Sequence, residues 1–498
     1  YSLFCCMPLE VPRRSWGRLR QFINGKWVEA HALGYAQLYD PGVGDVIGEV
    51  PLGGKEDVDE AVEAAYEAFK TWSRVPVPDR LQYLFKLKWV MEEFKEEFAR
   101  VNTLNHGKPI DDSRGDLRRS IENVEASIAV LLSLSKGEYQ REIAKDIDEI
   151  MMREPLGVFS IVTPYNFPIM IPFWFMPYAV ALGNTVVVKV SPVTPIPMTY
   201  VMEKIADIFP PGVVNLVHLD NSVVDYLVSH PLVSGTAFVG TSTIALKLYE
   251  TAARAGKRYL GGGSAANYAV VMPDAVLDRT VETLIHSKYG NAGQRCLAIQ
   301  NIVVVGDDDF YNKFKNAFVE RAKKLRVGYG LEESTEMGPM TTEQYRRNVI
   351  AKVDKAINDG AKVVLDGRDY KVSDYPRGFY LGPTILEGVT PDMDIVREEI
   401  FGPVANLIRA KNLDEVIDWI NKGKYHHSAA IFTQNGAWAR QFVNNVNVGN
   451  VGVNIGIAAP VGWFPFGGRG ISGLGSHHPQ IDVVDFFTDR KIAIVRWF

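Results

Sequence analysis

The chain has 498 residues, of which 47% are hydrophobic and 23% charged, and its formal net charge is -5. This balance is typical of a folded chain long enough for two or three packed domains, and it excludes a largely disordered protein. The acidic net charge argues against a general nucleic-acid binder, whose domains normally carry a basic excess. We therefore expect a small-molecule ligand and no nucleic-acid partner.

The cysteines and the N-terminal segment indicate the compartment. Cys5 and Cys6 are adjacent and Cys296 lies far from both, so no disulfide framework is possible, which is typical of a reducing environment. Residues 1–20 lack the charged, apolar and small-residue order of a signal peptide. No spacing indicates a metal site. We expect a cytoplasmic protein without a metal and interpret the N-terminus as a tail or arm.

The first part of the chain is predicted to be mostly helical. Apolar side chains recur at helical spacing over 56–72, and two further helices are expected over 79–104 and 116–135. From residue 157 the pattern changes to short β-rich runs. The runs "GVFSIVT", "NTVVVKV", "VVNLVHL" and "SGTAFVG" alternate with the helical "IPMTYVMEKIADIF" and "NSVVDYLVSH".

A second alternating series begins after residue 262, so the sequence predicts two α/β lobes built from right-handed βαβ units around parallel sheets. The apolar segment 157–190 is interrupted by prolines, which favours strand, loop, helix and strand over a membrane span. We therefore expect no membrane partner. The β-rich segments 137–155 and 483–498 fit neither series, and we expect them to form a protruding arm that contacts another subunit.

A glycine and hydroxyl residues stand where a predicted strand passes into a helix. Gly240 is followed by Thr241, Ser242 and Thr243, and the free N–H groups and dipole of a helix start favour a phosphate. The same pattern is more commonly only a helix cap. Because no G-x-G-x-x-G occurs at such a junction, any nucleotide is held in another way.

The stretch "GNAGQRC" makes Cys296 a candidate nucleophile. A lone cysteine is usually a small buried hydrophobe, but the glycines and Ala292 let a substrate approach the backbone closely. The N–H of Cys296 can then point at a developing oxyanion. Asn166, in "TPYNFP", can supply a second donor through its side-chain amide, although such an asparagine is most often a turn former.

Eight segments, in order and over nearly the whole chain, resemble the signature blocks of the aldehyde dehydrogenase superfamily. They are "TPYNFP", "GNTVVVKVSP", "PPGVVNLV", "AFVGTS", "GNAGQRC", "EEIFGPV", "NVGNVGVN" and "FPFGGRGISGLG". The resemblance implies an aldehyde dehydrogenase-like α/β fold and NAD(P)-dependent oxidation of an aldehyde to the acid. It makes Cys296 the nucleophile and places Asn166 with the Cys296 N–H in the oxyanion hole, and the thiohemiacetal becomes a thioester after hydride transfer.

The resemblance also implies cofactor residues and domains. Lys189 resembles the lysine at the adenosine ribose and Thr241 the hydroxyl residue at the phosphates. Glu399 and Phe401 resemble the pair at the nicotinamide ribose. The plain alternatives are a surface charge for Lys189 and Glu399 and a core aromatic for Phe401. Further implied cofactor positions are Thr163, Pro164, Tyr165, Ser191, Pro192, Gly212, Phe238, Gly240, Gly262 and Gly263. The implied domains are 1–130 with 152–261 for the cofactor, 262–452 for catalysis, and 131–151 with 476–498 for the oligomerisation arm of a homodimer or homotetramer.

The sequence lacks the glutamate that, in most members of this superfamily, activates the water that hydrolyses the thioester. No glutamate occurs between Glu250 and Glu282, and alignment on "VVMPDA" puts Gly262 at the position of the family's base. A later family carboxylate falls near His477. Without that base the thioester needs another group, for which we predict His477, or a better nucleophile such as coenzyme A.

The methylmalonate-semialdehyde dehydrogenase branch also lacks this glutamate and transfers its acyl group to coenzyme A. "SAANYAVVMPDA" and "GQRC" resemble that branch, although no lysine precedes Asn267. Its two carboxylate-binding arginines imply that role for Arg114 and Arg295, with plain surface arginines as the alternative. A CoA-acylating enzyme is thus the first alternative function, followed by a non-catalytic relative and a cysteine hydrolase.

A second departure concerns the coenzyme. Pro192 stands where many NAD-using members carry a glutamate that would repel a 2′-phosphate. Lys189 and Ser191 can then meet that phosphate. The sequence therefore favours NADP over NAD.

Overall fold

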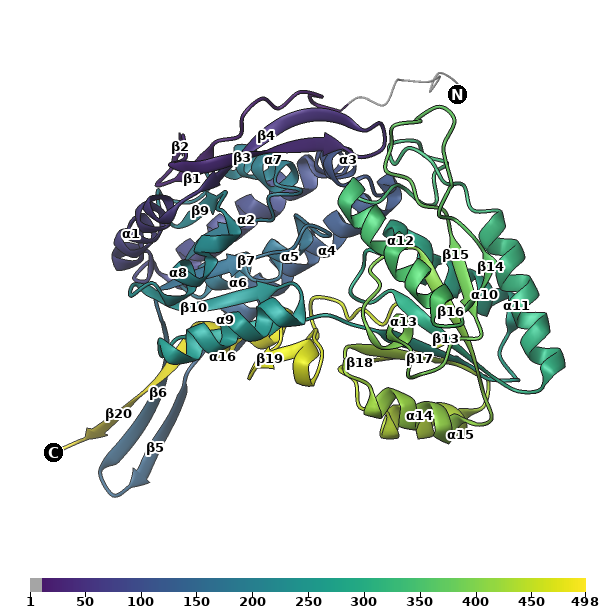
Figure 1. Cartoon of the computed structure of the whole chain (residues 1–498). Helices are drawn as coiled ribbons and strands as arrows, with labels where there is room; N and C mark the ends of the chain where they lie inside the picture. Colours follow the sequence, from purple (N-terminus) through teal and green to yellow (C-terminus); the bar gives the residue numbers. More distant parts are fainter. Residues whose placement is uncertain (1–10) are drawn as a thin grey trace, which may run out of the picture.

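The computed structural model describes residues 11–498, so Cys5, Cys6 and the start of the predicted N-terminal tail lie outside the described residues. Two α/β lobes stand side by side, and a narrow β arm projects from one of them (Figure 1). The predicted α/β fold with two lobes and an arm is confirmed. Among the described residues, no helix has the length and apolar character needed to cross a membrane.

The first lobe contains an eight-stranded sheet in the order β19-β11-β10-β7-β8-β9-β1-β2. Its strands are β1 (Gln21–Ile23), β2 (Lys26–Val28), β7 (Val158–Val162), β8 (Thr185–Lys189), β9 (Val214–Val217), β10 (Val233–Val239), β11 (Arg258–Gly262) and β19 (Gly473–Gly475). The central five strands are parallel. Every residue of β7 and β8 is buried, as expected of strands covered by helices on both faces.

Helices surround this sheet. They are α1 (Lys55–Trp72), α2 (Val77–Glu93), α3 (Lys95–His106), α4 (Ile110–Ala129, continued by a π turn), α5 (Met170–Phe173), α6 (Met176–Ala181), α7 (Ile196–Ile205), α8 (Val224–Ser229), α9 (Ser242–Arg254) and α16 (Val484–Phe487). The apolar segment 157–190 forms β7, α5, α6 and β8, which confirms the strand, loop, helix and strand interpretation.

The second lobe contains a seven-stranded sheet in the order β14-β15-β16-β13-β12-β17-β18, parallel except for β14. Its strands are β12 (Asn267–Val271), β13 (Ile299–Val305), β14 (Lys362–Leu365), β15 (Thr384–Glu387), β16 (Val404–Ala410), β17 (Ser428–Phe432) and β18 (Asn450–Val453). Its helices are α10 (Leu277–Tyr289), α11 (Asp308–Lys323), α12 (Glu343–Asn358), α13 (Asp394–Arg397), α14 (Leu413–Lys422) and α15 (Gly436–Asn445).

The arm is a separate antiparallel sheet in the order β20-β6-β5, with β5 (Glu138–Ala144), β6 (Ile147–Pro155) and β20 (Thr488–Arg496). Its strands extend beyond the predicted segment 131–151. Conversely, residues ahead of β20 belong to the body, because Phe486 and Phe487 are fully buried and Phe487 packs 4.7 Å from Phe159 of β7, centroid to centroid.

The N-terminal region differs from the mostly helical prediction. The hairpins β1–β2 and β3–β4 (Ala32–Asp40 and Asp45–Gly53) precede the first helix. The predicted helix 79–104 is interrupted at Phe94, whose backbone (φ -98°, ψ 9°) ends α2 and begins α3. The strands β1 and β2 extend the sheet of the first lobe by antiparallel pairing.

Candidate functional site

A strained loop between α10 and β13 presents Cys296. Asn291 (φ 52°), Ala292 (φ 50°) and Gly293 (φ 73°) follow one another in the left-handed region, which costs an ordinary residue about 1–2 kcal/mol. Asp112 on α4 holds the turn, since its Oδ2 accepts a 2.9 Å hydrogen bond from the Asn291 N–H. Such strain persists where surrounding contacts fix it, commonly at functional sites.

The backbone of Cys296 is anchored to the second lobe. Asn267 Nδ2 donates to the Cys296 carbonyl at 2.7 Å, and its Oδ1 accepts from the Ser428 N–H at 3.0 Å. Burial raises the pKa of the Cys296 thiol to about 12, and the nearby Glu399 carboxylate adds to that shift. The thiol is therefore protonated at neutral pH in the free protein and must lose its proton when it reacts.

Asn166 reaches the cysteine loop from the first lobe. It follows β7, is 3% exposed, and donates from Nδ2 to the carbonyl oxygen of Gln294 at 3.0 Å. The backbone carbonyl of Asn166 accepts a 2.7 Å hydrogen bond from Lys108 Nζ. The structure thus places the side-chain amide of Asn166, from the first lobe, against the loop that carries Cys296, two residues before the cysteine.

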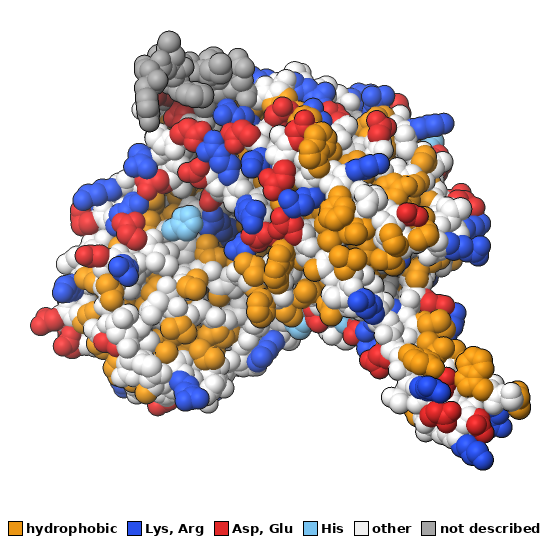
Figure 2. Space-filling model, turned by 180° about the vertical axis from the view of Figure 1, so that it is seen from behind, with side chains coloured by type: hydrophobic (Ala, Val, Ile, Leu, Met, Phe, Trp, Pro, Cys, Tyr) orange, Lys and Arg blue, Asp and Glu red, His pale blue; other side chains and the backbone are white. Residues whose placement is uncertain are grey.

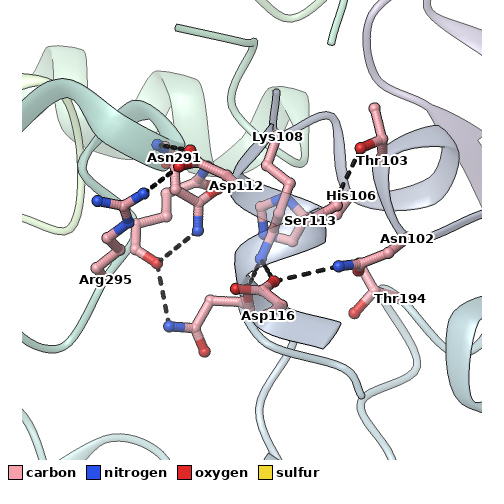
Figure 3. A network of polar contacts seen from close by, with 12 residues as sticks. Asn102, Thr103, His106, Lys108, Asp112, Ser113, Asp116, Thr194, Asn291 and Arg295 are labelled. Atoms are coloured by element: carbon pink, nitrogen blue, oxygen red, sulfur yellow. Dashed lines mark hydrogen bonds and ion pairs between the residues drawn. The ribbon is translucent and has the colours of Figure 1, made fainter. Parts of the chain in front are cut away.

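A buried ion pair supports Asn166. Lys108 Nζ lies 2.5 Å from Asp116 Oδ2, which also accepts from Asn102 Nδ2 at 3.1 Å (Figure 3). Burial lowers the pKa of Lys108 and raises that of Asp116, while each charge opposes the shift of the other. The pair connects α4 to the loop that carries the candidate oxyanion amide.

A cavity of about 860 Å³ opens onto Cys296. Asp112, Gly115, Asp116 and Arg119 line it at the i, i+3, i+4 and i+7 spacing that defines one face of α4. The other lining residues include Phe167, Met170, Trp174, Glu282, His286, Arg295, Leu297, Ile457 and Phe466. This volume accommodates a small organic substrate beside the thiol.

Only one of the two predicted carboxylate-binding arginines lines this cavity. Arg295 does, and its Nη2 lies 2.5 Å from Asp112 Oδ1. Arg114 does not, because its position on α4 directs it away from the lining face. It instead pairs with Glu96 at 2.9 Å and Glu333 at 2.7 Å. The prediction for Arg114 is therefore corrected.

Arg119 was missed by the sequence analysis. It lines the cavity with Arg295 and pairs with Glu122 at 2.7 Å. The helical spacing of Asp112, Asp116 and Arg119 is the signal that could have identified it.

A second, smaller cavity of about 40 Å³ also contains Cys296 in its wall. Gly262, at the end of β11, and His477 line it, so the position of the absent glutamate and its predicted substitute both lie near the thiol. A Cβ at Gly262 would be 3.4 Å from Val239, an ordinary contact. His427, which no sequence motif indicated, lines the same cavity.

Most predicted cofactor residues lie at the carboxyl ends of the first lobe's parallel strands, where α/β sheets bind ligands. Lys189 ends β8 and donates to Asn221 Oδ1 at 2.6 Å, and burial lowers its pKa to about 8. Thr163 follows β7, and within residues 11–498 its buried hydroxyl has no hydrogen-bond partner. Thr241 is the N-cap of α9 without a capping bond from its side chain. Pro164, Ser191, Phe238, Gly240, Gly262 and Gly263 share this edge.

The predicted nicotinamide-ribose pair comes from the second lobe. Glu399 Oε1 accepts from the Ala265 N–H at 2.9 Å, and burial raises the pKa of this carboxyl to about 6. Phe401 has a left-handed backbone (φ 55°), and its ring lies 5.9 Å from that of Tyr165. These contacts tie the second lobe to the cofactor edge of the first.

The two remaining predicted cofactor residues, Pro192 and Gly212, lie at opposite edges of the first lobe's sheet. Pro192 lines a cavity of about 510 Å³ together with Asp220 and Asn221. Gly212 instead precedes β9, at the opposite edge of the sheet, where its φ of 83° makes a turn and a Cβ would lie 2.5 Å from the Ala64 carbonyl. Packing against α1 requires a glycine here, and the structure places Gly212 away from the other predicted cofactor residues.

Comparison with known proteins agrees with this geometry. The model of the aldehyde dehydrogenase family matches residues 27–493. Malonate-semialdehyde dehydrogenase 1 of Oceanobacillus iheyensis is 39% identical over 482 residues, which cover 96% of this chain and 98% of that protein.

Solved structures of this family are also similar over nearly the whole chain. Methylmalonate-semialdehyde dehydrogenase from Oceanimonas doudoroffii superposes with a TM-score of 0.94 at 35% identity, covering 97% of this chain and 99% of that one. Betaine aldehyde dehydrogenase from Staphylococcus aureus in complex with NAD⁺ has a TM-score of 0.91 at 27% identity, covering 96% and 94%. The chain belongs to the aldehyde dehydrogenase family.

Proposed function

We propose that this enzyme oxidises a short, carboxylate-bearing aldehyde through a thioester on Cys296. The observation that carries the proposal is that Cys296 lines both the large cavity and the small one, beside the loop that Asn166 contacts. The thiol releases its proton to a solvent water in the open cavity as its sulfur bonds to the aldehyde carbon. The Asn166 amide and the Cys296 N–H stabilise the resulting oxyanion, and loss of a hydride leaves the thioester.

The residues at the cofactor edge fit a nicotinamide dinucleotide. The Thr163 hydroxyl, which has no partner within residues 11–498, the Thr241 side chain, which makes no capping bond at the α9 N-terminus, and Lys189 would hold the ribose and phosphates. Glu399 and Phe401 would hold the nicotinamide ribose. When bound, the coenzyme supplies the oxidant that accepts the hydride.

The choice between NADP and NAD rests on opposing features. Pro192 removes a repelling carboxylate and supports the predicted preference for NADP, whereas Asp220 and Glu343 line the same cavity and favour NAD. A relative in the family was solved with NAD⁺. We propose NADP as the preferred coenzyme, and the ratio of kcat/KM values for the two coenzymes tests this.

The substrate class is proposed from the arginines at the large cavity. Arg119 and Arg295 line it with Cys296, and the related enzymes are named for malonate and methylmalonate semialdehydes, which carry a carboxylate. Asp112 already neutralises Arg295 at 2.5 Å. Arg119, whose partner Glu122 does not line the cavity, is therefore the principal candidate for contact with the substrate carboxylate.

Arg119→Gln tests that contact. We expect kcat/KM for 3-oxopropanoate to fall roughly 10- to 100-fold, because a hydrogen bond to a charged group contributes about 1.5–3 kcal/mol. Steady-state rates with propanal, which lacks the carboxylate, should remain unchanged. Arg114→Gln is the matched control on the same helix, outside the cavity, and should alter neither substrate. An equal loss with propanal would contradict the assignment.

The fate of the thioester is tested by product analysis of the purified enzyme with propanal, NAD or NADP, and with or without coenzyme A. We propose hydrolysis to the free acid by a water activated at the small cavity, whose wall includes His477, the base predicted from the sequence. Free acid at full rate without coenzyme A supports hydrolysis. A single burst of reduced coenzyme that resumes only with coenzyme A supports the acylating alternative. Unchanged acid formation and pH profile in His477→Ala would exclude that histidine.

The arm supports the proposed homodimer or homotetramer. Tyr139, Ile143, Ile492, Ile494 and Trp497 expose half or more of their surface, and Figure 2 shows hydrophobic side chains along the projecting arm. Large exposed apolar patches usually mark contacts with another chain. We propose that a second copy covers them.

A further inference from the structure

We infer that His427 is the general base that activates water to hydrolyse the thioester, in place of the glutamate absent at Gly262. The inference rests on the proposed thioester at Cys296. It concerns only the second half of the reaction, the release of the acid.

His427 is a buried imidazole whose ring packs in the core but whose two nitrogens form no hydrogen bond within residues 11–498. It precedes β17 and is 3% exposed, and its ring lies 5.3 Å from that of Phe466, centroid to centroid. Neither ring nitrogen has a hydrogen-bond partner anywhere in residues 11–498. Leaving a buried polar group unpaired costs about 1–3 kcal/mol. A side chain retained at that cost, in a cavity with a nucleophile, points to a ligand of that cavity.

The cavity suits one small polar molecule. Its volume of about 40 Å³ exceeds the roughly 10–15 Å³ needed to hold a water. Trp174 also lines it, and among the described residues the buried Nε1–H of this indole has no acceptor. The Trp174 N–H and a lone pair of His427 therefore offer a donor and an acceptor to a water beside the Cys296 sulfur.

The imidazole has the protonation state that a base requires. Burial lowers the pKa of His427 to about 4, so at neutral pH one ring nitrogen carries a free lone pair. Each of the other two histidines at the cavity already uses its Nδ1 in a hydrogen bond. His477 Nδ1 is 2.8 Å from Ser476 Oγ, and His478 Nδ1 is 3.3 Å from Asp482 Oδ2. Among the three histidines at the cavity, His427 is the one with both ring nitrogens unpartnered in residues 11–498, which is why we assign the base to it.

The step balances without another reagent. The water oxygen bonds to the thioester carbonyl carbon while His427 takes one of its protons. The carbon–sulfur bond then breaks, the acid leaves, and the Cys296 sulfur recovers a proton from the imidazolium. Water is consumed, and no oxidation or reduction occurs in this half of the reaction.

His427→Leu tests the inference. A stopped-flow trace with propanal and coenzyme should retain a burst of one reduced coenzyme per site, because acylation does not use His427. Acid release should then fall roughly 10²- to 10⁴-fold, the usual contribution of a general base. The melting temperature should not fall, because leucine leaves no unpaired nitrogen. Coenzyme A should restore turnover, since its thiol replaces water as nucleophile.

Two variants serve as comparisons. His426→Leu removes the neighbouring imidazole, whose Nδ1 also lacks a partner among the described residues but which lines neither cavity, and should hydrolyse normally. His477→Ala should lose much less acid release than His427→Leu. Wild-type acid release by His427→Leu, a greater loss in His477→Ala, or wild-type enzyme that forms no acid without coenzyme A would each overturn the inference. Absence of any coenzyme reduction in a single turnover of the wild type would instead refute the proposed thioester chemistry.

Discussion

Cys296→Ala should abolish both the burst of reduced coenzyme and steady-state turnover, by roughly 10⁴- to 10⁶-fold, the loss seen when a covalent nucleophile is removed. No other cysteine lies within the described residues, and the oxyanion donors have no function without a sulfur bonded to the substrate. Rapid mixing of enzyme, coenzyme and aldehyde measures the burst directly.

Two controls separate lost chemistry from lost structure. Coenzyme binding by titration calorimetry and the melting temperature should match the wild type, because alanine occupies the same half-buried position. Since the pKa of the Cys296 thiol is raised to about 12, alkylation of the free wild-type enzyme by iodoacetamide should accelerate steadily as the pH rises toward that value. A burst that survives in Cys296→Ala would disprove the assigned nucleophile.

Asp116→Ala should destabilise the protein by about 3–5 kcal/mol, because it leaves the Lys108 ammonium buried without its counter-ion. Urea unfolding followed by circular dichroism measures the loss. Turnover should also decrease, since Lys108 donates to the Asn166 carbonyl and so positions the oxyanion amide.

The double variant Lys108→Met with Asp116→Leu removes both charges and should recover most of the stability, though not the support of Asn166. Asp111→Ala changes an exposed carboxylate on the same helix and should stay within about 0.5 kcal/mol of the wild type. An Asp116→Ala protein as stable as the wild type would show that the ion pair makes no net contribution.

The sequence predicted the parallel strands and most helices because their side-chain periodicity is dictated by burial on one or both faces. It missed the first hairpin although Asn24 and Gly25 form an Asn-Gly turn with φ of 51° and 74°, the standard signal for two short paired strands. No glycine or proline marks the interruption at Phe94, so the sequence gives no sign that α2 ends there and α3 begins.

The candidate site divides in the same way. Cys296 and Asn166 were identifiable from short motifs, because the chemistry requires particular side chains on particular loops. Helical spacing puts Arg119 on the same face of α4 as Asp112 and Asp116, but the resemblance of the surrounding motif indicated Arg114 instead. His427 was not predictable: it lies 131 positions from Cys296 in the chain, and only the packing of β17 beside β12 brings it to the cavity wall.

The proposed nucleophile Cys296 and the proposed oxyanion amide of Asn166 belong to different lobes, which are joined by the hydrogen bond from Asn166 to the Gln294 carbonyl. The second lobe has a hydrophobic core of its own, whereas the core of the first lobe extends across the boundary: Leu297 and Leu331 belong to it, and Cys296 packs against it. Separating the lobes therefore also opens the core of the first lobe, so on heating the loss of turnover and the loss of the circular dichroism signal should occur together.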